Sequence, residues 1–142
     1  MAAKKNLGEL LIKENLIDMS QLESAKKHQA ESGGNLTGAL VNLGYVNEKD
    51  LAQFLGQQYE LPHIDLENFE CDPEAIKMLS SQVCEKHMVI PISKAGKTLV
   101  VAFADPSNIF VKDDLALLTR CKIEAVVASE VAIKQAIEKY YG

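Results

Sequence analysis

The residues of this chain that could recognise a ligand occur twice, in two segments of matching pattern. Leu7 and Leu36 open the segments and Gln29 and Gln58 close them, and the same interval separates the members of each pair. A helix that begins at each leucine would present free backbone N–H groups and a partial positive charge, which together bind phosphate. The leucines would contact flat bases, and the glutamines would donate and accept hydrogen bonds. The spacing is therefore compatible with two half-sites for a ligand of two-fold symmetry. The other matched pairs are Asn6/Asn35, Leu11/Leu40 and Leu22/Leu51.

The same repeat also has a purely structural explanation. Leucines recur because two helix pairs need apolar faces to close one core, and glutamine is a good helix former. The residues by themselves favour this explanation, and the half-site interpretation stays open beside it.

Signatures of catalysis are absent from the sequence. It contains no GxxxxGK[ST] loop, no GxGxxG after a strand, no HExxH and no paired-cysteine metal motif. Asp105 follows an apolar run, a position where polar groups often meet ligands, but an Asp before Pro also initiates a turn and caps a helix. The turn interpretation of Asp105 is favoured. We therefore expect no catalytic residues, no metal site and no enzymatic activity in these 142 residues.

Charge and composition exclude further classes of function. The net charge is −5 and Arg120 is the only arginine, which argues against binding a nucleic-acid polymer. Three cysteines without a CxxC spacing favour reduced thiols. No signal peptide is recognised, and no apolar run approaches the ~20 residues of a membrane span. We expect a cytoplasmic protein without direct membrane insertion.

Residues 1–60 are expected to form a four-helix unit built from two tandem helix pairs. Short helices are predicted over 7–12 and 36–43, and Asn15 and Gly44 take the positions that need a left-handed backbone. Asp18 with Gln21 resembles a capping box, and Asn47 is expected to cap the last helix.

Residues 61–142 are expected to form a second, α+β subdomain. An extended connector over 61–66 leads to a helix start at Asp72-Pro73. Strands are predicted over 88–92, 98–103 and 123–127, with a turn at 94–97, as a small and largely antiparallel sheet packed with helices. Tyr140 and Tyr141 are expected to pack the closing helix.

Residues 6–17 with Leu22 and Gln29 resemble a repeat of the form RLGxxLLxxGLIxxxxLxxxLxxQ, and 36–58 resembles its second copy. That repeat is typical of the N-terminal domain of type IV pilus assembly and type II secretion ATPases, the PilB/GspE/MshE kind. The resemblance continues through 54–59, 61–66, 85–91, 104–109, 127–130 and 137–141.

The resemblance implies a non-catalytic regulatory and docking domain. In this family a hexameric motor, which holds ATP in a phosphate-binding loop, lies downstream. The implied role is to couple that motor to the inner-membrane platform of the pilus machine, or to its cytoplasmic adaptor proteins. The chain would thus lie at the inner membrane only through partners.

The resemblance also implies an alternative function, because many family members bind cyclic di-GMP with one half of the dinucleotide on each repeat. The implied contacts are Asn6, Leu7, Gly8, Leu22, Gln29, Asn35, Leu36, Thr37, Leu51 and Gln58, with Asp105 as a further candidate. Asn6 and Asn35 stand where the family has arginine, Thr37 replaces one glycine, and Asn15 replaces another. Losing two charge-assisted contacts of about 1.5–3 kcal/mol each would weaken binding by roughly two to four orders of magnitude.

Overall fold

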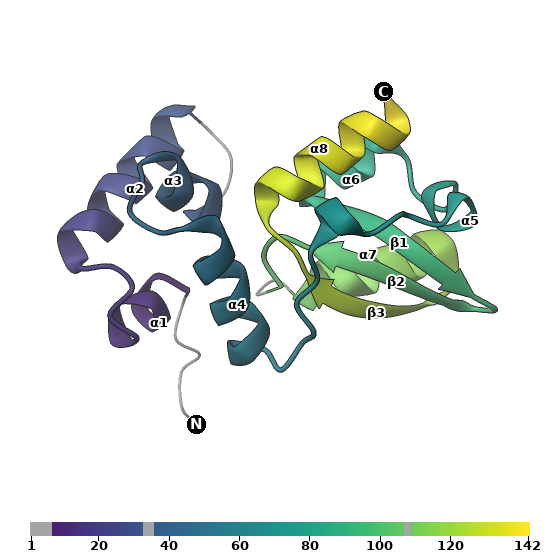
Figure 1. Ribbon diagram of the computed structural model, residues 1–142, viewed down its shortest axis with the longest axis horizontal. Helices are drawn as coiled ribbons and strands as arrows, with labels where there is room; N and C mark the ends of the chain where they lie inside the picture. Colours follow the sequence, from purple (N-terminus) through teal and green to yellow (C-terminus); the bar gives the residue numbers. More distant parts are fainter. Residues whose placement is uncertain (1–6, 33–35, 107–108) are drawn as a thin grey trace. The chain divides into compact units, whose positions relative to one another are not determined.

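The chain folds into two compact units, Met1–Asp50 and Leu51–Gly142, each of which is described by itself. The computed structural model (Figure 1) describes residues 7–32, 36–106 and 109–142. The division between the units falls inside helix α4 (Glu48–Gln58). The sequence instead places a boundary after residue 60, at the end of that helix, and this boundary stays a prediction.

The helices of the tandem repeat begin at matching positions. Helices α1 (Leu7–Lys13) and α3 (Leu36–Asn42) have the same length, and both their starts and their ends are separated by the interval of the sequence repeat. The starts of helix α2 (Met19–Ser32) and α4 are separated by that same interval. The helix-pair repeat predicted from sequence is therefore present in the backbone.

The two short helices end in the same hydrogen-bonded turn. Asn15, with φ 61°, and Gly44, with φ 77°, adopt the left-handed backbone expected of them. The N–H of Leu16 donates to the Leu11 carbonyl, and the N–H of Tyr45 donates to the Leu40 carbonyl, both at 3.0 Å. These are Schellman endings, which satisfy carbonyls that the last helical turn leaves without a partner.

Side chains cap the long helices where the sequence predicts. Asp18 Oδ1 accepts from the Gln21 N–H at 2.8 Å, and Gln21 Oε1 accepts from the Asp18 N–H at 3.0 Å, which completes a capping box. Asn47, the equivalent residue of the second copy, accepts from the Lys49 N–H at 2.8 Å.

The second unit is built on a three-stranded sheet of order β1-β2-β3. Strands β1 (Val89–Ala95) and β2 (Thr98–Phe103) form an antiparallel hairpin, and β2 pairs in parallel with β3 (Lys122–Val127). Half of the pairing thus differs from the largely antiparallel sheet expected. The reason is the crossover helix α7 (Ile109–Thr119), which returns the chain to the starting end of β2 so that β3 runs in the same direction.

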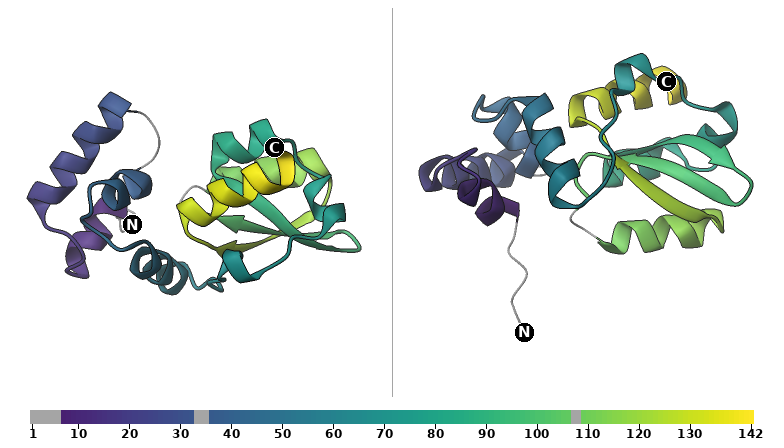
Figure 2. Two further views of the ribbon diagram at one scale, coloured as in Figure 1. Left: turned by 45° about the horizontal axis from the view of Figure 1, so that its top comes forward. Right: turned by 60° about the horizontal axis from the view of Figure 1, so that its bottom comes forward.

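Helices cover both faces of this sheet. Helix α7 packs beside β3, whereas α5 (Pro73–Ile76), α6 (Ser81–His87) and α8 (Glu130–Tyr141) contact β1. Figure 2 shows α7 on one face of the sheet and α8 on the other. Leu99, Leu115 and Ile133 are fully buried in the resulting core. The connector adds a short 3₁₀ turn, η1 (Leu66–Asn68), and its Ile64 N–H donates to the Val127 carbonyl at 2.9 Å.

The two tyrosines at the end of α8 fasten this helix to distant segments. The Cys71 N–H donates to Tyr140 Oη at 3.0 Å, and Tyr141 Oη donates to the Ile76 carbonyl at 2.8 Å. The Cys84 thiol also donates to Tyr141 Oη at 3.6 Å. Burial raises the pKa of Cys84 to about 11 and moves the pKa of Tyr141 well above its ordinary value. The packing role expected for Tyr140 and Tyr141 is confirmed.

Candidate functional site

The first copy of the repeat places its leucines in the core rather than on a surface. Leu7 and Leu22 are 8% and 4% exposed, and Gly8 is buried in the first turn of α1. Gln29 is half-buried near the end of α2. In this structure the leucines therefore serve the apolar interior, as the structural explanation of the repeat requires.

The second copy repeats this arrangement only in part. Leu36 is half-buried where Leu7 is buried, and Thr37 is 2% exposed. These two residues share the first compact unit with the whole first copy. Leu51, which is buried, and Gln58, which is exposed, belong to the second unit.

Three further residues bear on whether cyclic di-GMP binds, and the described residues of the repeat include none of them. Asn6 and Asn35, which stand where the family repeat has arginine, fall outside the described residues. Asp105 is half-buried just after β2 in the second unit, so the described structure does not assign it to the repeat. Its expected capping of the following helix stays a prediction, because residues 107 and 108 also fall outside the described part.

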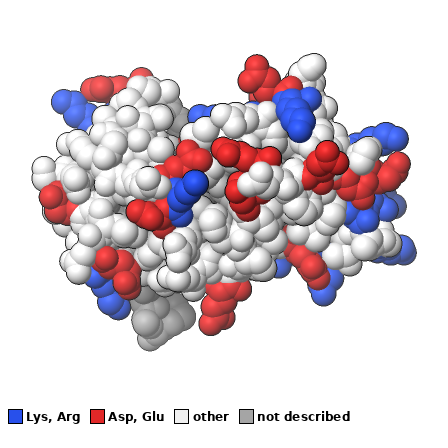
Figure 3. Space-filling view, in the orientation of Figure 1, with Lys and Arg blue, Asp and Glu red and all other residues white. Residues whose placement is uncertain are grey.

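The repeat contains no arginine, so it offers no guanidinium group to an anion. The only arginine, Arg120, follows α7 in the second unit. Any phosphate held by the first unit would therefore depend on backbone N–H groups, amides or lysine. On the face drawn in Figure 3, Lys and Arg side chains are scattered among Asp and Glu rather than gathered. Among residues 7–32, 36–106 and 109–142, no three His, Cys, Asp or Glu side chains form a metal-binding group.

Sequence reasoning missed a groove between α6 and α8. It has a volume of about 450 Å³, with Met88 and Ile137 as apolar lining and Glu85, Lys134 and Glu138 as charged lining. These residues come from two segments that are far apart in the chain, so no local pattern joins them. The one available signal was that α8 carries charges beside its buried Ile133 and Ile137 face.

Within the described part of the chain, no helix combines the length and the apolarity required to cross a membrane.

The chain is similar to known proteins over nearly its whole length. It is 50% identical over 136 residues to the type IV pilus assembly ATPase PilB of Myxococcus xanthus, which covers 96% of this chain and 24% of that protein. It is 34% identical over 119 residues to PilB of Thermus thermophilus, covering 80% of this chain and 13% of that protein. The chain thus spans a quarter or less of the length of these curated relatives.

Solved structures show the same fold. A structure of MshE with cdg, an abbreviation of cyclic di-GMP, has a TM-score of 0.72 and 32% identity, covering 97% of this chain and 100% of that one. The N-terminal domain of XpsE has a TM-score of 0.77 at 23% identity, covering 99% of this chain and 100% of that one. The second likeness shows the fold alone, and it supports the α+β architecture expected from sequence.

A family match completes the comparison, because residues 59–142 match the MshEN domain. The chain therefore belongs to the MshEN domain family, homologous to the N-terminal region of type IV pilus assembly and type II secretion ATPases.

Proposed function

We propose that this chain is a non-catalytic docking and regulatory domain of a type IV pilus assembly ATPase, which couples the motor to the inner-membrane pilus machine. The observation that carries this proposal is the 50% identity to PilB of Myxococcus xanthus over 96% of the chain. The matched region is 24% of that protein, so most of the ATPase lies outside it. No phosphate-binding loop is present in the 142 residues.

The build of the second unit suits such a role. Tyr140 accepts a hydrogen bond from the Cys71 N–H and Tyr141 donates one to the Ile76 carbonyl, which ties α8 to the segment around α5, and the core side chains of the unit are almost fully buried. A body packed in this way transmits displacement instead of absorbing it, because close-packed interiors have low compressibility. A docking domain of a motor requires that property.

Deleting the region that corresponds to residues 1–142 from the full-length ATPase tests this proposal. We expect surface pili to be lost, while the purified remaining motor still hydrolyses ATP. Normal pilus assembly after the deletion would contradict the docking role. Loss of ATP hydrolysis by the remaining motor would contradict the statement that the domain is non-catalytic and separable.

A second candidate function is that of a cyclic di-GMP sensor, and the observation that favours it is the 32% identical structure of MshE with cdg. The leucine and glutamine positions of both repeats are retained here, whereas Asn6 and Asn35 remove the cationic contacts. We propose that the chain keeps the scaffold of such a site with an affinity reduced roughly 10²- to 10⁴-fold from that of an arginine-bearing repeat.

Calorimetry with cyclic di-GMP separates the two functions. The variant Asn6→Arg/Asn35→Arg should bind more tightly than the natural chain by about those orders of magnitude. The matched control is Gln82→Arg/Gln135→Arg, which adds the same charge in the second unit, outside the repeat, and should leave affinity unchanged. Equal affinity in all three proteins would reject the repeat as the binding site, and no heat even for the arginine variant would reject the sensor.

A further inference from the structure

Helix α7 has an apolar outer face that the core does not use. Val111, Leu115 and Thr119 form its buried stripe, at spacings of four residues. Three other large apolar side chains of the helix, Phe110, Leu117 and Leu118, are 70%, 79% and 61% exposed. Three large apolar side chains at this exposure on one short helix are unusual, because isolated exposure is ordinary but clustered exposure marks an interaction site.

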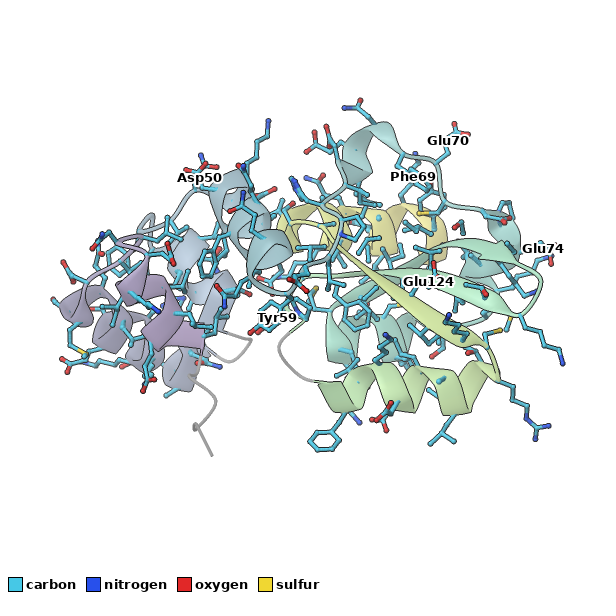
Figure 4. The ribbon with its side chains drawn as sticks, turned by 90° about the horizontal axis from the view of Figure 1, so that it is seen from below. Asp50, Tyr59, Phe69, Glu70, Glu74 and Glu124 are labelled. Carbon is cyan, nitrogen blue, oxygen red and sulfur yellow. The ribbon has the colours of Figure 1, made fainter. Side chains whose placement is uncertain are left out.

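The spacing of Phe110 and Leu117 places both side chains on one line along the helix. Phe110 and Leu117 are seven residues apart, so they lie on one line along the helix, about 10 Å apart at 1.5 Å per residue. Leu118 is one position further on, about 100° around the helix, so it lies on the flank beyond Asp114. Figure 4 shows α7 on the side of the sheet opposite α8, with side chains projecting outward from it. We call Phe110, Leu117 and Leu118, together with Asp113 and Asp114, the α7 face.

The two aspartates decide what this face can bind. Asp113 and Asp114 are exposed and lie at the turn between Phe110 and Leu117, one on each side of the apolar line. Lys112 lies on another flank of the helix and Arg120 follows its end, so neither covers the centre of the face. The centre of the face is therefore apolar with a carboxylate on each side.

This charge pattern disfavours a second copy of the same chain. In an antiparallel pair of α7 helices the midpoint of the line would fall at Asp113 and Asp114. Four carboxylates from the two copies would then lie close together along the two sides of the contact, and like charges repel most strongly where water is excluded. An anionic lipid surface is disfavoured for the same reason, with a chain of net charge −5.

We infer that the α7 face docks an amphipathic helix of a separate protein, with apolar residues at i, i+3 or i+4 and i+7 and Lys or Arg on both flanks. The apolar side chains of that helix would contact Phe110, Leu117 and Leu118. Its cations would pair with Asp113 and Asp114 at the two sides of the apolar line. This inference rests on the proposed docking function and names the surface and the partner chemistry that it uses.

A binding measurement with a defined probe tests the inference. The probe is a short, labelled, amidated peptide with leucines at i, i+3, i+4 and i+7 and lysines elsewhere, and anisotropy reports its binding to the 142-residue chain. Leu117→Ser/Leu118→Ser and Asp113→Asn/Asp114→Asn should each weaken binding at least ~10-fold, which is ~1.4 kcal/mol. Because all four side chains are exposed, the variants should melt at the temperature of the natural chain.

Matched controls separate the α7 face from general attraction to an acidic protein. Met19→Ser removes an exposed apolar side chain in the first unit, and Glu14→Gln/Glu31→Gln removes two exposed charges there. Both controls should bind the probe normally, and a peptide with glutamate in place of lysine should not bind. Equal weakening in controls and test variants would overturn the inference, as would binding of the glutamate peptide.

Two further measurements address the other occupants. Sedimentation should show no self-association that depends on Leu117 and Leu118, and such self-association would overturn the inference in favour of a second copy.

In the full-length ATPase, Leu117→Ser/Leu118→Ser should abolish pili while ATP hydrolysis is retained. If this variant makes pili and the deletion of residues 1–142 does not, the α7 face is rejected and the docking domain stands.

Discussion

The two units of this chain can be compared by the sequence separation of the residues that their hydrogen bonds join. The capping and turn hydrogen bonds of the first unit join residues only a few positions apart, in the Schellman endings at Asn15 and Gly44 and in the caps at Asp18 and Asn47. The second unit has local caps of the same kind, at Asp72, Ser80 and Ser129. Both units bury an apolar core, and in the second unit hydrogen bonds between residues as far apart as Cys71 and Tyr140 also fasten α8 to its neighbours.

The largest effect is expected from the core of the second unit. Ile133 is fully buried among strands and helices, so Ile133→Ala should lower the free energy of unfolding by about 2–5 kcal/mol. Val131 lies on the same helix but is 38% exposed, and Val131→Ala should cost less than ~1 kcal/mol. Urea unfolding followed by circular dichroism measures both. Equal costs would mean that α8 is not held by its buried face.

Alkaline pH should also destabilise the second unit, by less than the core truncation. Burial raises the pKa of Cys84 from 9.0 to about 11 and that of Tyr141 further still. Above pH 9 the unfolded chain therefore loses protons that the folded chain retains, so stability declines as the pH rises from 9 to 11.

Thermal unfolding between about pH 8 and pH 11 measures this decline. Tyr141→Phe should reduce the slope, since a group that cannot ionise contributes no proton linkage. A slope that Tyr141→Phe does not alter would show that other groups govern alkaline unfolding.

A smaller effect is expected where the connector approaches α4. A Cβ on Gly56 would lie 2.9 Å from the Leu61 carbonyl oxygen, and this oxygen belongs to the backbone and cannot rotate away. Gly56→Ala should therefore cost about 1–2 kcal/mol, even though alanine favours a helix. Lys27 is the equivalent residue of the first copy and is exposed, so Lys27→Ala should be nearly neutral. A stabilised Gly56→Ala protein would show that the connector can move.

The two Schellman endings should respond in opposite directions, with a cost at Gly44 similar to that at Gly56 and the smallest effect of all at Asn15. Gly44 has space for a side chain but a φ of 77°, so Gly44→Ala should cost about 1–2 kcal/mol through backbone strain alone. Asn15 already bears a side chain at φ 61°, and Asn15→Gly should gain a few tenths of a kcal/mol. Melting temperatures of both variants measure these changes. Opposite signs are required, and a shared sign would show that the two turns are not equivalent.

Sequence reasoning located the helices of the tandem repeat well because their determinants are local. A residue that tolerates a left-handed backbone, followed three residues later by Asp18 or Asn47, specifies a helix end and the next helix start without reference to distant segments. The strands of the second unit were also located, because a short run rich in β-branched residues is a local signal too. The hairpin turn falls at Gly96, whose φ of 60° suits a tight turn.

For the candidate site, the sequence predicted the matched positions of the repeat but not which way their side chains face. Leu7, Leu22 and Leu51 are matched by the repeat, but the pattern alone does not say whether a leucine faces a ligand or the core. The structure buries all three. The α6–α8 groove and the α7 face were not predicted. Each depends on how the helices pack on the sheet, and that packing joins segments that are far apart in the chain.

The sequence by itself determined where the helices of the tandem repeat begin, that Asn15 and Gly44 are left-handed, and to which family the chain belongs. These features depend on residue types a few positions apart. Only the tertiary structure decided that β3 runs parallel to β2, that Tyr140 and Tyr141 fasten α8, and that Leu117 and Leu118 stay exposed while Leu115 is buried. Those outcomes depend on contacts between segments far apart in the chain, and burial is fixed only when those segments pack together.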